Sequence, residues 1–103
     1  MEKIERDISN LSGEIARMCV NITNLTEHDS FFYYEADVNQ ISIYVHINGW
    51  GDNSKTQRHE LYLFLMKKTY SGFDWESKYI KECKLKLTQL NKIKKELSKL
   101  IQI

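Results

Sequence analysis

An unbroken heptad repeat of apolar residues occupies the first quarter of the chain. Its members are separated alternately by four and three positions: Ile4, Ile8, Leu11, Ile15, Met18, Ile22 and Leu25. This spacing is typical of a helix that packs lengthwise against another helix, and β-branched residues at a with unbranched residues at d favour a pair. We therefore predict a helix over residues 2–25 that has a partner helix.

The end of the chain repeats this pattern. Apolar residues recur in steps of three and four between Ile80 and Ile101, and Asp74 or Ser71 can cap the helix that they predict over residues 75–101. Together the two helices predict a seam, formed either within one chain or between two. Its residues are Ile8, Leu11, Ile15, Met18, Ile22, Leu87, Leu90 and Leu97.

The segment between the helices alternates apolar and polar residues, as half-buried strands do. We predict strands over 31–37, 41–48 and 61–66, with a turn at 38–40 and a polar loop over 49–60. The predicted fold class is α+β, a single domain over residues 1–103 in the order α-β-β-β-α. It has a three-stranded antiparallel sheet and two long terminal amphipathic helices.

The predicted helices are longer than the predicted sheet. A strand of seven residues spans about 23 Å, whereas a helix of 27 residues spans about 40 Å. The excess apolar length has to pack on the other helix or on a second copy of the chain. We therefore predict a homodimer.

Composition predicts a cytoplasmic protein without a membrane span. The chain is 42% hydrophobic and 28% charged, no apolar run is long enough to cross a bilayer, and the first residues are charged rather than apolar. Cys19 and Cys83 fall on or beside the apolar stripes, as free buried thiols do. The absence of proline and the excess of lysine over arginine indicate an AT-rich genome, such as that of a phage or its low-GC host.

No motif predicts catalysis, a cofactor or a metal site. The three histidines lack the spacing of zinc ligands, and we expect His28 and His59 to be solvated loop residues. Gly49-Trp50-Gly51 lacks the third glycine and the following helix of a phosphate-binding loop. We expect a protein that is not an enzyme.

Aromatic residues mark the second face of the predicted sheet, where a one-sided sheet is normally polar. A helix could cover this face, or it could be an exposed surface for a protein partner. The predicted partner-binding residues, including one on the adjacent loop, are Tyr33, Tyr44, His46, Trp50, Tyr62 and Phe64.

Charge is distributed unevenly along the chain. Residues 1–60 carry 5 basic and 10 acidic side chains, whereas residues 61–103 carry 10 lysines and 4 acidic side chains. Six of these lysines predict a basic face on the last helix, which is either simply solvated or able to bind phosphates. They are Lys78, Lys81, Lys84, Lys92, Lys95 and Lys99.

These patterns predict a protein that acts by binding. The first expectation is a small inhibitor or adaptor of another protein, such as a phage or mobile-element product directed at a host defence nuclease. The alternative is a nucleic-acid-binding protein that uses the basic face of its last helix.

Overall fold

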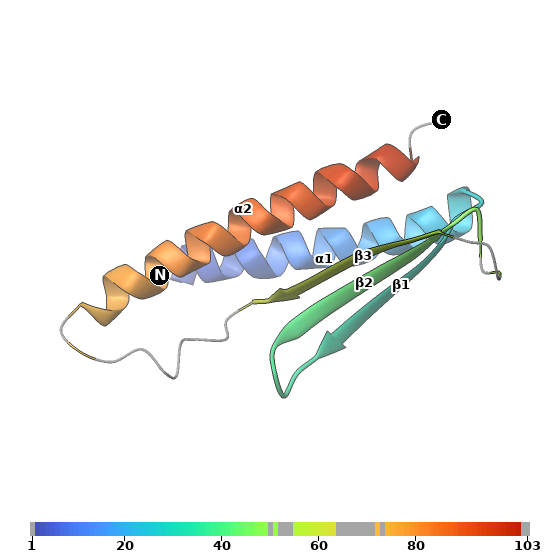
Figure 1. Ribbon diagram of the computed structural model, residues 1–103. Helices are drawn as coiled ribbons and strands as arrows, with labels where there is room; N and C mark the ends of the chain where they lie inside the picture. The colour runs from blue at the N-terminus through green and yellow to red at the C-terminus, as the bar shows by residue number, and fades with distance from the viewer. Residues whose placement is uncertain (1, 50, 52–54, 64–71, 73, 102–103) are drawn as a thin grey trace.

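The computed structural model describes residues 2–49, 51, 55–63, 72 and 74–101. It has the predicted α+β fold, with two helices and a three-stranded antiparallel sheet (Figure 1). In chain order the elements are α1 (Glu2–Leu25), β1 (Asp29–Glu35), β2 (Gln40–Ile47), β3 (Lys55–Tyr62) and α2 (Trp75–Ile101).

The strands lie in the order β1-β2-β3, so β2 is central and each of its neighbours is an edge strand. A four-residue turn joins β1 to β2, in which the Asn39 N–H donates to the Ala36 carbonyl over 3.3 Å. Asn39 has φ +50°, a left-handed conformation that asparagine adopts more readily than most residues. The turn fixes the register, pairing Phe32 with Ile43.

The third strand differs from its prediction. We expected it to begin at Leu61, but β3 begins at Lys55 and ends at Tyr62, so much of the predicted 49–60 loop is strand. Its first six residues are polar because most of their side chains remain exposed to water, and backbone pairing with β2 holds them in place. Hydrophobic alternation could not reveal a strand of this kind.

The inner side of the sheet is aliphatic and forms one wall of the core. Ile41, Ile43 and Val45 on β2 are fully buried, and Phe32 on β1 and Leu61 on β3 pack beside them. The helices lie on one side of the sheet and leave its other side uncovered (Figure 1). The molecule is elongated, with principal extents of 51 × 24 × 17 Å.

The two helices lie side by side and run in the same direction (Figure 1). They are parallel because the chain reverses its direction through three consecutive strands between them. The Lys94 ammonium donates to the Glu14 carboxylate over 2.8 Å and joins the two helices. The helices therefore pair within one chain, which is one of the two arrangements that the heptad pattern allowed.

The predicted seam residues line this pairing. Ile8, Leu11, Ile15, Ile22, Leu90 and Leu97 are buried, and Met18 and Leu87 pack against the core while partly exposed. The buried stripe also includes Ser12 and Cys19, whereas Leu25 is 66% exposed. A straight helix of 3.6 residues per turn drifts from a 3.5-residue repeat, so its buried side turns away from the last heptad position.

Candidate binding face

The outer side of the sheet carries a cluster of aromatic and basic side chains that we call the aromatic face. Strand pairing places its members side by side, since Phe31 lies opposite Tyr44, Tyr44 opposite Arg58, and His46 opposite Thr56. Side chains directly opposite one another point to the same side of a sheet. The aromatic face comprises Phe31, Tyr33, Tyr44, His46, Thr56 and Arg58.

The rings of the aromatic face contact one another across β1 and β2. Phe31 stacks with Tyr33 at a centroid distance of 6.4 Å, and meets the edge of His46 at 5.4 Å. Tyr33 lies edge-on to Tyr44 at 6.0 Å. Aromatic pairs in these arrangements stabilise each other by about 0.5–1.5 kcal/mol beyond their burial, so the surface is preorganised.

Polar contacts connect the side chains of β2 and β3 on the aromatic face. The Arg58 guanidinium lies over the Tyr44 ring, 5.2 Å from its centroid, and the Tyr44 hydroxyl donates to Glu60 over 3.0 Å. Thr56 Oγ1 and His46 Nδ1 are 3.1 Å apart. Within the described part of the chain Arg58 has no carboxylate partner, so its donors remain available.

A groove of about 510 Å³ runs between these six side chains. Its walls are open to water, with Phe31 36% and Tyr33 51% exposed. No described helix covers this side of the sheet (Figure 1). The rings are therefore available to another molecule instead of being part of the core.

Four of the six predicted partner-binding residues lie on this side of the sheet. Tyr33, Tyr44 and His46 belong to the groove, and Tyr62 is 41% exposed farther along β3. Trp50 and Phe64 lie outside the described residues.

Sequence reasoning missed three members of the aromatic face. Phe31 belongs to the predicted strand over 31–37 but is not among the predicted partner-binding residues, and Thr56 and Arg58 fall within the predicted 49–60 loop. Residues 55–60 are all polar, so no hydrophobic alternation in the sequence could place the last two on a strand.

His59 differs from the expectation of a solvated loop residue, whereas His28 lies in the loop between α1 and β1, as expected, and is partly exposed. His59 lies on the inner side of β3, opposite Ile43, where burial lowers its pKa and the nearby Glu96 carboxylate opposes that shift. His59 Nε2 is 3.0 Å from Gln57 Oε1. His28 Nδ1 accepts the Asn48 N–H over 2.9 Å and so anchors the turn after β2. Both histidines therefore have structural contacts.

Two further groups with shifted pKa values, Cys19 and Tyr79, lie in the core, away from the aromatic face. Burial raises the pKa of the Cys19 thiol, and the Ser30 hydroxyl opposes that shift. Burial also raises the pKa of the Tyr79 phenol, and so does its contact with Cys83. The Cys19 thiol and this phenol are therefore uncharged at neutral pH, as core residues normally are.

The six predicted lysines form a second surface, the lysine face, on α2. All six are exposed and lie about half a turn around the helix from its buried stripe. Lys78 forms an ion pair with Asp74, and Lys99 forms one with Glu96. Among the described residues the other four have no ion-pair partner, so the face has a net positive field.

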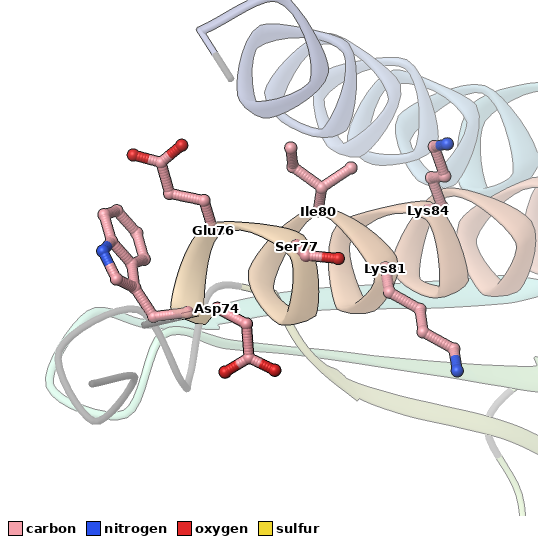
Figure 2. A pocket seen from close by; sticks show the side chains of 7 residues that line it. Asp74, Glu76, Ser77, Ile80, Lys81 and Lys84 are labelled. Carbon is pink, nitrogen blue, oxygen red and sulfur yellow. The ribbon is translucent and has the colours of Figure 1, made fainter. Parts of the chain in front are cut away.

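A wide hollow of about 870 Å³ lies at the start of α2. Figure 2 shows its side chains spreading apart, with Asp74 and Lys81 on one side and Glu76 and Ile80 on the other. A small-molecule site requires polar groups that converge on one point. The hollow therefore contributes Lys81 and Lys84 to the lysine face and has no site of its own.

Within the described residues, no group of three or more histidine, cysteine or carboxylate side chains is placed to hold a metal ion. In the same part of the chain, neither helix combines the length and the apolar character that a transmembrane segment needs.

Comparison with protein-family models, with curated proteins and with solved structures finds no match to this chain.

Proposed function

We propose that this chain is a cytoplasmic, non-enzymatic protein that binds another protein through its aromatic face and thereby inhibits or adapts it. The observation that supports the proposal is an exposed cluster of stacked rings around a guanidinium without a carboxylate partner. Tyrosine and arginine are enriched among the residues that dominate protein interfaces. A host defence nuclease is the target that we propose, on the basis of the AT-rich composition typical of a phage or mobile element.

Arg58 is suited to the centre of an interface. Its guanidinium lies over Tyr44, so little side-chain freedom is lost when a partner binds. Rings that already contact one another also have few rotamers left to lose. The face is therefore organised before binding, which raises the affinity obtained from a given buried area.

The test is a pull-down from lysate of the host with the full chain as bait. The variant combines Tyr33→Ala, Tyr44→Ala and Arg58→Ala, which removes the centre of the aromatic face while leaving the aliphatic core intact. A matched control combines Arg6→Ala, Arg17→Ala and Val20→Ala, three exposed positions on α1. We expect the partner to be lost with the first variant and retained with the second.

Circular dichroism establishes that both variants are folded before the comparison. A folded first variant that captures the same partner as the parent chain would exclude the aromatic face as the binding surface. Loss with both variants would assign binding to another part of the molecule.

The lysine face supports nucleic-acid binding as a second candidate function. Its lysines extend from Lys78 to Lys99, about 32 Å along the helix, on the side that faces away from the core. Binding through phosphates weakens as salt rises, with a log–log slope of about −0.9 for each phosphate contact. A gel-shift titration of duplex DNA over several salt concentrations measures this slope, and absence of binding at low salt removes the candidate.

The homodimer is a separate proposal, because the seam that suggested it is filled within one chain. Light scattering at micromolar concentration measures the mass in solution, which is 12.3 kDa for one chain and twice that value for the dimer. A mass equal to one chain would exclude the dimer.

A further inference from the structure

The outer edge of β1 is the second feature of the sheet that a partner can use. β1 is an edge strand, so one row of its backbone N–H and C=O groups faces away from β2. Ser30 belongs to this row, since its N–H donates to Thr23 Oγ1 over 2.8 Å and its carbonyl accepts from the same hydroxyl over 3.3 Å. Thr23 on α1 therefore closes the beginning of the edge.

Beyond Ser30 this edge is open. Alternate residues of an antiparallel strand direct their backbone groups to the same side, so Phe32 and Tyr34 also face away from β2. Within the described part of the chain, no turn, loop or side-chain hydrogen bond uses the backbone groups of these two residues. They leave two N–H donors and two carbonyl acceptors in a row.

The two edges of the sheet are protected differently. β3 carries Lys55, Arg58 and Glu60, and α2 lies alongside it, where Gln89 and Lys92 share a groove with strand residues. Charged residues and a covering helix are the usual protection against unwanted strand pairing. From Phe31 to Tyr34, β1 carries no charge, and in Figure 1 it is the strand farthest from α2.

We propose that the partner of the aromatic face adds an extended segment to the open edge of β1, and that this segment carries a lysine or arginine near its end. This inference depends on the proposed function and names the form of its partner. The new strand would bond to Phe32 and Tyr34, and its alternate side chains would lie beside Phe31 and Tyr33 on the aromatic face.

The charge of the segment follows from the end of β1. Glu35 is exposed at the last position of the strand, and Asp37 follows in the turn. β1 itself contains no lysine or arginine, so the β1 strand of a second copy would bring no counter-charge to Glu35. A basic segment of another protein would neutralise the negative charge at this end of β1, whereas pairing with a second copy of β1 would leave that charge without a counter-charge.

The experiment uses the full chain and two synthetic peptides as probes. Each peptide has a core of alternating valine and threonine, with lysine at both ends in one and glutamate at both ends in the other. Symmetric ends make the result independent of whether the strand adds in a parallel or an antiparallel direction. We expect the lysine peptide to bind about tenfold more tightly by fluorescence anisotropy, and to slow hydrogen exchange at Phe32 and Tyr34.

Two variants at one position isolate the backbone contribution. Tyr34→Pro and Tyr34→Ala both lose the exposed ring and its hydroxyl bond to Asn39, but only proline also removes the outward N–H. Proline is tolerated in an edge strand whose N–H faces solvent. We expect the lysine peptide to bind the alanine variant and not the proline variant.

Several results would overturn the inference. These are equal affinity for the two peptides, no binding of either one, protection at other amides, or equal binding by the two Tyr34 variants. A dimer that dissociates only in Tyr34→Pro would assign the edge to a second copy and would equally overturn it. A partner lost through the Tyr33, Tyr44 and Arg58 substitutions but retained by Tyr34→Pro would leave the proposed function intact and reject the added strand alone.

Discussion

The inner and outer sides of the sheet are built from the same three strands but differ in their exposure to water. On β2, Ile43 is 0% exposed, whereas on β1 the outward-facing Tyr33 is 51% exposed. The inner side is aliphatic and packs against the helices, while the outer side is aromatic and polar and packs on nothing in the described chain. One side of this small sheet is therefore buried and stabilises the fold, and the other is exposed and is the side that we propose binds a partner.

Truncation of one residue on each side gives the largest expected contrast. Ile43→Ala removes buried methyl groups that the surrounding core cannot fully replace, so we expect it to lower the free energy of unfolding by about 2–5 kcal/mol. Tyr33→Ala removes one exposed ring and its aromatic contacts, and we expect a loss of about 1 kcal/mol or less. Urea denaturation measures both, and equal losses would contradict the division of the sheet.

His59, on the inner side of β3, predicts a smaller effect on the stability of the folded chain, and this effect depends on pH. Burial lowers the pKa of His59 in the folded chain, so the unfolded chain binds a proton at that residue first. The stability that neutral His59 contributes is therefore complete above its ordinary pKa of 6.5 and is lost as pH falls through the lowered value. We expect His59→Gln to flatten the fall in melting temperature between neutral and mildly acidic pH.

The two proteins differ only at residue 59, so the difference between the two pH profiles isolates His59. Profiles that run parallel down to acidic pH would mean that the inner side of β3 does not resist protonation, and would weaken the contrast between the two sides.

The exposed ion pair between Glu14 on α1 and Lys94 on α2 predicts the smallest effect on stability. Hydrogen bonding to Lys94 lowers the pKa of the Glu14 carboxylate, but both side chains remain open to water, where such pairs contribute little. We expect Glu14→Gln to lower the melting temperature slightly, and only at low salt. Glu76→Gln, at an exposed position on α2 without an ion pair among the described residues, is the matched control. A loss as large as that of Ile43→Ala would contradict the view that stability resides in the buried side.

The sequence predicted the helices better than the sheet, for a physical reason. Both helices have a continuous buried stripe, and their bounds of 2–25 and 75–101 agree with the structure. β3 has no such stripe, because its beginning is held by backbone bonds to β2 rather than by burial of its side chains. An edge strand of this kind leaves only a weak trace in hydrophobicity.

The aromatic face could be predicted only in part. The alternation of β1 and β2 placed Tyr33 and Tyr44 on one side, and the structure agrees. Whether a helix covers that side depends on the packing of α1 and α2, and the position of Arg58 over Tyr44 depends on the register between β2 and β3. Neither is encoded in a local pattern.

The pairing of the first helix with the last has a consequence for how the chain is made. Glu14 and Lys94 meet across 80 positions of sequence, so the part of the α1 stripe that packs on α2 has no partner until α2 has been synthesised. At usual rates of translation that interval is roughly 4–16 seconds. Throughout this interval the nascent chain exposes apolar surface, and exposed apolar surface is what makes unfinished chains prone to aggregation.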